Sequence, residues 1–366
     1  MSKRQLAMVL DLNKCIGCQT CTVACKTQWT NRNGREYMYW NNVETSPGEG
    51  YPRNWQNSGG GFDPSGSLKN GVVPPMDDYG YPWEYNTAGL AKGEQYRPDK
   101  DPKWGPNWEE DQGAGNFPKD NYFFYLPRLC NHCDNPGCLA ACPRDAIFKR
   151  DEDGVVLIDQ ERCQGYRYCV AGCPYKKVYF NPKTGKSEKC IFCFPRVEKG
   201  LPTACAQQCV GRIRFLGFLD DKESQVAKLV NEYKVAIPLR PDYGTEPNVF
   251  YIPPVFNPDK LDDEGIPVPE SMRIPDAELE EMFGEAVFPA MEKIKNELKR
   301  RKDTGESEML DLLIAFKHSE MFRLDEGYYM DNSKALGYNK LKPIDERYRS
   351  GKFTSKITHF APGGQA

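Results

Sequence analysis

The chain has 366 residues, with 49 Lys plus Arg against 52 Asp plus Glu and a formal net charge of −3. This near balance argues against nucleic acid as the main partner. The hydrophobic fraction is 39%, and the 32 Gly and 29 Pro residues together make about one residue in six, so we expect loops to dominate the fold.

At the N-terminus, Met1–Gln5 holds one basic pair without an apolar stretch behind it. This predicts neither a Sec leader nor a twin-arginine leader. No apolar run approaches the ~18 residues of a membrane span. Taken alone, these features favour a cytoplasmic protein. The first predicted element is a strand over Gln5–Leu12, which leads directly into the first cysteines.

A long stretch over residues 31–120 follows and is rich in Gly, Pro, Asn and aromatic residues. All six Trp residues of the chain lie in it or beside it. A loop of this length is usually either functional or disordered, and the aromatic content argues against disorder. We expect an ordered arm that contacts a partner protein, rather than a loop that packs only on its own domain.

Two short β-hairpins are predicted in the middle of the chain. The first joins Ala146–Lys149 to Val155–Asp159 across an acidic turn that ends in Gly. The second joins Val178–Phe180 to Ser187–Lys189 across a Pro-Lys-Thr-Gly turn. A further strand is predicted over Arg212–Leu219.

The last third of the chain reads as a tail. Residues 248–275 are Pro-rich and extended, Asp276–Arg301 has apolar residues at helical spacing, and a second helix is predicted over Glu306–His318. Core packing would explain the apolar stripe, but the rest of the chain offers it little surface. A tail that wraps another subunit is an equal possibility.

All fifteen Cys residues fall into four tight groups. The groups are Cys15, Cys18, Cys21 and Cys25; Cys130, Cys133, Cys138 and Cys142; Cys163, Cys169 and Cys173; and Cys190, Cys193, Cys205 and Cys209. Thiolates at such spacing hold iron–sulfur clusters. In the third group, Tyr166 stands where a C-x2-C-x2-C-x3-C pattern has its second thiol, and we expect its bulky, neutral side chain to fill that space.

The groups are expected to work in pairs, because the fourth Cys of a group in two-cluster ferredoxins ligates the other cluster. Groups two and three are close in sequence and form one pair, which leaves groups one and four for the other. The expected ligand sets are Cys15, Cys18, Cys21 and Cys209 for cluster one; Cys130, Cys133, Cys138 and Cys173 for cluster two; Cys142, Cys163 and Cys169 for cluster three; and Cys25, Cys190, Cys193 and Cys205 for cluster four.

Sets one, two and four suit [4Fe–4S] clusters. The three thiolates of set three suit a [3Fe–4S] cluster, which lacks the corner iron that a fourth Cys would hold, and we expect its potential to be relatively high. The alternative for this site is a [4Fe–4S] cluster whose fourth iron binds solvent or the Tyr166 phenolate.

Other metal chemistry fits the spacing less well. Structural zinc uses two cysteine pairs separated by a loop, and a disulfide framework fits badly with an odd number of Cys in a long chain. A Rieske centre needs two His ligands, but only His132 lies among the cysteines, and His318 and His359 are far away. We expect His132 beside a cluster or at the surface.

Many basic residues are close in sequence to the cysteines, Lys189 and Arg214 among them. Such residues raise cluster potentials, bind carboxylates of a partner or simply form a solvated face. The chain has no P-loop and no strand-linked dinucleotide-binding glycine motif. These features predict a protein that moves electrons and has no catalytic residues of its own.

The predicted fold class is α+β, with two interleaved ferredoxin-like units of the bacterial 2[4Fe–4S] type. Residues 1–30 and 185–247 form the first unit, and residues 121–184 form the second unit, inserted within the first. Residues 31–120 are the long insertion and residues 248–366 are the extended and helical tail. The protein without metal should be poorly folded, because cluster binding and folding are coupled.

Five segments resemble the iron–sulfur β subunits of the type II dimethyl sulfoxide reductase family, and the ethylbenzene dehydrogenase β subunit in particular. They are Asp11–Cys25, Tyr37–Thr45, Phe123–Cys133, Tyr166–Phe180 and Lys189–Gly211. The resemblance extends to the β subunits of steroid C25 dehydrogenase, dimethylsulfide dehydrogenase and the perchlorate, chlorate, selenate and nitrate reductases. It covers most of residues 4–325 and leaves residues 326–366 unmatched.

The resemblance implies a catalytic α subunit with a molybdenum bis-guanine-dinucleotide cofactor and one further [4Fe–4S] cluster, and a γ subunit with haem b. It implies that electrons pass through clusters one, four, two and three in that order, and that the tail wraps the catalytic subunit. It also implies a periplasmic complex, exported folded with the α subunit, in place of the cytoplasmic location that the N-terminus favours.

The function expected from these features is electron transfer in a hydrocarbon, alkylaromatic or steroid hydroxylating dehydrogenase. The alternative is the same role in an oxyanion reductase. A free-standing polyferredoxin is a third possibility, although a soluble carrier needs neither the arm nor the tail. A formate-dehydrogenase-like β subunit is a further possibility. Such subunits usually have a Cys at the position of Tyr166 and a membrane helix, and this sequence predicts neither.

Overall fold

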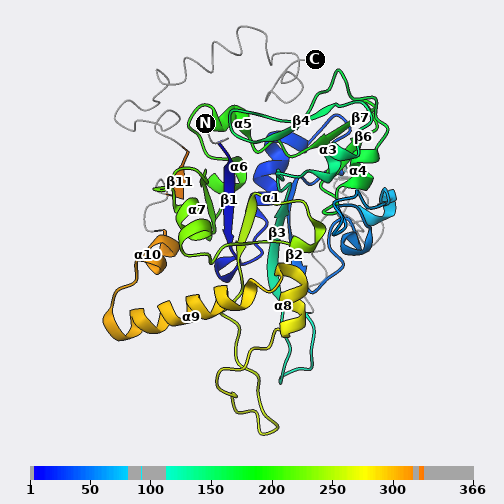
Figure 1. Ribbon diagram of the computed structural model, residues 1–366. Coiled ribbons are helices and arrows are strands. Elements are labelled where there is room, and N and C mark those ends of the chain that lie inside the picture. Colours follow the sequence, from blue (N-terminus) through cyan, green and yellow to red (C-terminus); the bar gives the residue numbers. More distant parts are fainter. Residues whose placement is uncertain (1–3, 81–91, 93–112, 316–320, 325–366) are drawn as a thin grey trace.

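The computed structural model describes residues 4–80, 92, 113–315 and 321–324. A five-stranded sheet lies at its centre (Figure 1), and its strands are ordered β11-β8-β1-β10-β9. In that order they span Phe322–Arg323, Arg214–Phe218, Leu6–Asp11, Val249–Ile252 and Ile237–Pro238. All six residues of β1 are buried, as expected for an apolar run that is covered on both faces.

The predicted strands before the first cysteine and after the last are therefore confirmed, and they pair with each other. β1 runs antiparallel to β8, with Met8 opposite Leu216, and parallel to β10, with Met8 opposite Val249. The partner β10 lies just beyond residue 247, so the segment expected to begin the tail adds a strand to the central sheet.

Both predicted hairpins are also confirmed, and a third pair of strands joins the long insertion to the second cysteine group. The pairs are β4 (Ile147–Lys149) with β5 (Val156–Ile158), β6 (Val178–Asn181) with β7 (Lys186–Lys189), and β2 (Asn41–Ser46) with β3 (Phe124–Leu129). The mixture of small sheets and short helices agrees with the predicted α+β class.

Short helices hold many of the cysteines. They are α1 (Thr20–Cys25), α3 (Gly137–Ala140), α4 (Tyr168–Gly172) and α6 (Ala204–Gln207), and a fifth short helix, α5 (Phe194–Val197), begins directly after Cys193. Helix α1 packs on α6, and α3 packs on α4. The first packed pair therefore joins the first cysteine group to the fourth, and the second packed pair joins the second group to the third.

The described half of the long insertion packs inside its own chain. The side chains of Trp40, Tyr51 and Trp55 are each about 1% exposed. Short helical turns at Trp55–Asn57 (η3) and Met76–Asp78 (η4) lie within this half. Trp83, Trp104 and Trp108 lie outside the described residues, and contact of the insertion with a partner stays a prediction.

The tail contains two helices where one was predicted over Asp276–Arg301. Helix α8 (Asp276–Phe283) ends at Gly284, whose φ of +70° suits Gly, and α9 (Val287–Thr304) begins after it. The apolar stripe is buried on this chain: Leu279, Met282, Phe283, Val287, Met291 and Ile294 are all 6% exposed or less.

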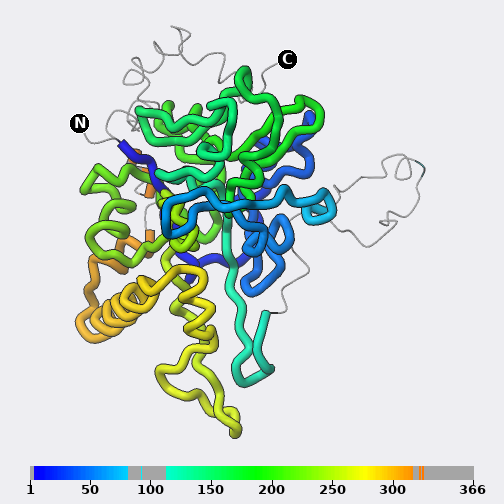
Figure 2. Tube along the Cα trace, turned by 45° about the vertical axis from the view of Figure 1, so that its right-hand side comes forward, coloured from blue at the N-terminus to red at the C-terminus, as the bar shows by residue number. Residues whose placement is uncertain are grey.

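The second predicted tail helix is confirmed but shorter, as α10 (Glu308–Ile314). Ser307 caps α10 by accepting a hydrogen bond from the Leu310 N–H at 3.2 Å. Before α8, residues 254–272 project from the body beside residues 113–123 (Figure 2), and the Leu261 N–H donates to the Lys119 carbonyl at 2.9 Å. Wrapping of a catalytic subunit by the tail stays a prediction.

The remaining short elements connect the sheets. They are η1 (Leu12–Lys14), η2 (Lys26–Thr30), α7 (Gln225–Ala227), η5 (Lys228–Glu232) and η6 (Pro241–Tyr243). None of the helices in the described part of the chain combines the length and apolar character needed to cross a membrane.

A buried ion pair joins the long insertion to the second cysteine group. Arg128 on β3 donates from Nε and Nη2 to the two carboxylate oxygens of Glu44 on β2, at 2.8 and 2.6 Å. Its guanidinium also lies 3.7 Å from the Trp55 ring centre and donates to the Tyr51 and Tyr175 carbonyls. Burial raises the pKa of Glu44, but Arg128 outweighs burial and the pKa is lowered overall.

Glu44→Gln should destabilise the fold by about 3–5 kcal/mol, because it leaves the Arg128 charge buried without its partner. Since the pKa of Glu44 is held below its ordinary value, its contribution is complete above the ordinary Glu pKa and is lost as pH falls through the lower folded value. Thermal unfolding of the two proteins at neutral pH measures the difference.

The matched control is Glu49→Gln, which weakens an exposed pair with Arg53 and should cost less than about 1 kcal/mol. Equal losses in the two variants would contradict the role given to the buried pair.

Candidate iron–sulfur cluster sites

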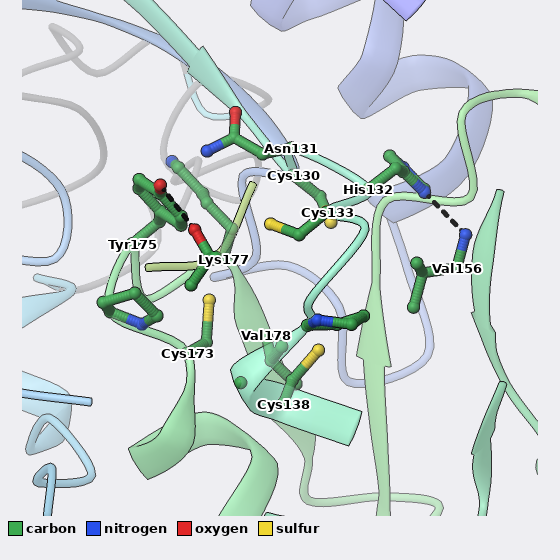
Figure 3. A pocket seen from close by; sticks show the side chains of 14 residues that line it. Cys130, Asn131, His132, Cys133, Cys138, Val156, Cys173, Tyr175, Lys177 and Val178 are labelled. Atoms are coloured by element: carbon green, nitrogen blue, oxygen red, sulfur yellow. Dashed lines mark hydrogen bonds between the residues drawn. The ribbon is translucent and has the colours of Figure 1, made fainter. Parts of the chain in front are cut away.

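All fifteen Cys residues lie in the described part of the chain, and none of them forms a disulfide bond. Four of them, predicted together as set two, line one cavity in the interior: Cys130, Cys133, Cys138 and Cys173. Figure 3 shows the sulfur atoms of Cys133, Cys138 and Cys173 turned toward a shared space. Cys130 follows β3, Cys138 is on α3 and Cys173 comes directly after α4, so three separate segments form the site.

A second cavity is lined by all four members of set four: Cys25, Cys190, Cys193 and Cys205. Cys25 is the last residue of α1 and Cys205 lies on α6, so the packing of these two helices brings them together. Trp29 forms part of the wall and donates its indole N–H to Cys193 Sγ at 3.1 Å. Such hydrogen bonds to sulfur are among the controls on cluster potential.

The members of set one lie at the edge of the molecule. Burial raises the pKa of Cys15 to about 12, with smaller contributions from its neighbours Cys21 and Cys209. Cys209 therefore lies beside the first group, although it belongs to the fourth in sequence. Cys18 is exposed, which places this site where another protein can approach it.

The three members of set three also come from two cysteine groups and lie close together. Burial raises the pKa of Cys169 to about 11, and Cys163 and Cys142 are near enough to raise it further. Backbone N–H groups donate to two of these sulfurs, from Ala146 to Cys142 and from Ser187 to Cys163, each at 3.4 Å. Cys142, from the second group, thus lies with the third.

Tyr166 does not fill a buried space beside set three, as the sequence led us to expect. Its side chain is 58% exposed, and its ring packs edge-on against Tyr168 at 6.5 Å between ring centres. Arg167 between them has a φ of +66°, a left-handed backbone turn. The loop therefore presents both rings at the surface.

The four sets follow one another through the molecule. Cys21 and Cys25 on α1 place set one beside set four, and Cys21 affects the pKa of Cys205 directly. Cys130 raises the pKa of Cys190, which places set four beside set two. Helices α3 and α4 then link set two to set three. The order of neighbours is one, four, two, three.

The chemistry of the cavities fits anionic clusters. Burial raises the pKa of the Cys193 thiol to about 12, so an empty site holds protonated thiols and cluster insertion must release protons. No three His, Cys, Asp or Glu side chains within the described residues are arranged around a single metal ion. A multi-iron cluster, whose ligands are spread around four irons, matches this spacing better than zinc does.

Some of the basic residues that are close to the cysteines in sequence are buried beside the sulfurs, and for these the solvated face considered above is excluded. In the described part of the chain, five Lys and Arg side chains are fully buried: Arg128, Lys176, Lys177, Lys189 and Arg214. Arg214 donates to Cys21 Sγ at 3.3 Å. Burial opposes its charge, but the neighbouring Cys21 and Cys205 outweigh burial and raise the pKa of Arg214. An oxidised cubane with four thiolates has a net charge of about −2, so such clusters would balance these cations.

His132 lies in the wall of the set-two cavity and is about 1% exposed. Its Nδ1 accepts a hydrogen bond from the Val156 N–H at 3.1 Å, and its ring packs on Phe192 at 4.8 Å between ring centres. Burial lowers its pKa, and Lys189 adds to that effect. The neutral ring is a neighbour of the site. His318 and His359, the other candidates for a Rieske centre, lie outside the described residues.

Comparisons with known proteins identify the family. Residues 121–219 match the model of a 4Fe-4S dicluster domain, and residues 6–27 match a 4Fe-4S binding domain. The dimethylsulfide dehydrogenase subunit beta of Rhodovulum sulfidophilum is 63% identical over 327 residues, which cover 88% of this chain and 100% of the relative.

Two further relatives are similar over nearly the same range. The selenate reductase subunit beta of Thauera selenatis is 56% identical over 88% of this chain and 99% of its own. The perchlorate reductase subunit beta of Dechloromonas aromatica is 52% identical over 87% of this chain and 96% of its own. This chain belongs to the β subunits of the type II dimethyl sulfoxide reductase family.

Membership of this family makes the chain an iron–sulfur electron-transfer subunit. The comparisons back the oxyanion-reductase alternative better than the hydrocarbon-hydroxylating dehydrogenase that the sequence features led us to favour. The resemblance rested on segments around the cysteines, which bind clusters and do not contact substrate, so they carry no direct information on the substrate.

Exchange of the last cysteine between groups can be tested with two variants of α4 and the residue that follows it. Cys173→Ala should remove about four iron atoms and the set-two cluster, because the Cys173 sulfur faces that cavity. Cys169→Ala should instead remove about three iron atoms and the set-three cluster. Iron analysis with EPR of each variant gives the answer.

The pairing would be refuted if Cys173→Ala abolished the set-three signal while leaving the [4Fe–4S] signals unchanged.

Proposed function

We propose that this chain relays single electrons through three [4Fe–4S] clusters and one [3Fe–4S] cluster, between a molybdenum-containing catalytic α subunit and a γ subunit with haem b. The observation that supports this most directly is the pair of interior cavities, each lined by four sulfurs from two cysteine groups. When bound, the clusters accept and release one electron at a time.

The packing of the short helices supports one route for the electrons. Helices α1 and α6 hold sets one and four side by side, and α3 and α4 do the same for sets two and three. The exposure of Cys18 supports set one as one end of the route, and the exposure of Tyr166 and Tyr168 supports set three as the other. We assign the first end to the catalytic subunit and the second to the haem subunit.

We propose that the complex is an oxyanion reductase, in which electrons enter at the haem and leave through set one. The support is the similarity to selenate, chlorate, perchlorate and nitrate reductase β subunits, at 52–56% identity. A second candidate, with the opposite direction of flow, is a dimethylsulfide dehydrogenase, which the 63% identity to that β subunit favours. The proposed location is the periplasm, by export together with the catalytic subunit.

The substrate class is tested on the purified native complex. Oxidation of reduced viologen should depend on selenate, chlorate, perchlorate or nitrate if the complex is a reductase. Reduction of a dye by dimethylsulfide would instead establish the second candidate. Turnover only with ethylbenzene or a steroid would contradict both, and purification of the chain alone as a brown monomer would indicate a free-standing polyferredoxin.

The set-three cluster is tested by EPR of the oxidised protein. A [3Fe–4S] centre is paramagnetic when oxidised and ordinary [4Fe–4S] centres are not, so the oxidised complex should give a signal. Tyr166→Cys supplies the missing thiol and should convert the site toward [4Fe–4S], with loss of that signal.

Tyr168→Cys is the matched control, because Tyr168 is similarly exposed but stands outside the ligand spacing, and it should leave the signal intact. An oxidised wild-type sample without any signal would refute the assignment.

A further inference from the structure

Lys189 lies between two of the cysteine cavities. It is the last residue of β7, directly before Cys190, and its side chain is about 1% exposed. Its Nζ donates to Cys130 Sγ at 3.6 Å, to the Cys190 carbonyl at 3.1 Å and to the Val156 carbonyl. Cys130 lines the set-two cavity and Cys190 lines the set-four cavity, so the ammonium group is near both.

The protein residues around Lys189 satisfy its hydrogen bonds but leave its charge unbalanced. Two of its acceptors are neutral carbonyls, and within the described residues no carboxylate forms a salt bridge with it. A buried charge without a counterion costs several kcal/mol. Arg128 is a useful contrast, since it is equally buried but is paired with Glu44. Lys189 therefore requires anionic charge in the cavities themselves.

We propose that Lys189 is a shared countercharge for the clusters of sets two and four. This inference rests on the proposed function, since it needs a cluster in each cavity. A fixed positive charge beside a cluster favours its reduced state, which is more negative by one unit, and so raises the reduction potential. Because Lys189 is near both cavities, it raises both potentials together.

The shared position has a consequence for electron transfer. An electron that passes between sets four and two moves one negative charge from one side of Lys189 to the other, without any bond forming or breaking and without proton transfer. A cation near only one site would hold the electron there. Lys189 stabilises the electron on either side, and its attraction for both reduced clusters offsets part of their mutual repulsion.

Arg214 has a similar position at the preceding junction. Its Nη2 donates to Cys21 Sγ of set one at 3.3 Å and to Asn41 Oδ1 at 2.8 Å, and its charge lowers the pKa of Cys205 of set four. The same kind of contact thus recurs where sets one and four meet, which supports a role for buried cations between neighbouring sites.

The test is an EPR-monitored redox titration of the purified complex with Lys189→Met, Lys189→Arg and Lys293→Met. Lys189→Met keeps the alkyl chain and removes the charge, so the equilibrium constants for reduction of clusters two and four should both fall about tenfold or more, or about 59 mV for one electron. Lys189→Arg keeps the charge and should restore both potentials toward wild type.

Lys293→Met is the control for net charge. Lys293 lies on α9 over the Tyr233 ring, away from the cysteines, and its loss should change neither potential. Clusters one and three should also keep their potentials in Lys189→Met, which a general loss of folding would not allow.

The outcomes separate this inference from the proposed function. A wild-type complex without clusters in sets two and four would overturn the proposed function. Intact clusters whose potentials do not move in Lys189→Met, or of which only one moves, would overturn the shared countercharge. If Lys189→Met loses both clusters, Lys189→Arg decides: both clusters present near wild-type potentials support the inference, and their absence contradicts it.

Discussion

The exchange of one cysteine between paired groups is the constraint on which the rest of the structure depends. Cys25 ends α1 near the N-terminus, yet it lines a cavity with Cys190, Cys193 and Cys205. Cys173 joins Cys130, Cys133 and Cys138 in the same way. Each exchange fixes two distant segments against each other, which is how a chain with 39% hydrophobic residues builds an ordered interior from short strands and helices of one or two turns.

Charge balance is the second constraint, and it follows from the first. Placing anionic clusters in the interior would be costly if only neutral groups surrounded them. The chain instead buries cations beside the sulfurs, with Arg214 at Cys21 and Lys189 at Cys130. Among the described residues no carboxylate forms a salt bridge with either cation, so we expect cluster binding, folding and control of potential to be linked through the same few residues.

The sequence was sufficient for features governed by local spacing. The cysteine intervals predicted which residues the structure brings together, and the Gly-containing turns predicted both hairpins. Packing between distant segments was not accessible in this way. The pairing of β2 with β3 is accompanied by the buried Glu44–Arg128 contact, and neither residue stands out in sequence. The break between α8 and α9 rests on the φ of Gly284, and an isolated Gly in a helical pattern is often tolerated.

At the cluster sites, too, local spacing predicted some features and packing between distant segments decided others. Lys189 and Arg144 are both basic and near cysteines in sequence, yet Lys189 is buried and Arg144 is exposed, because only the fold decides which side chain faces a cavity. If all fifteen Cys residues hold four iron–sulfur clusters, metal and sulfide analysis of the purified complex, corrected for the α subunit, should find about 15 iron atoms per β chain and no zinc. Stoichiometric zinc, or about eight iron atoms or fewer, would contradict it.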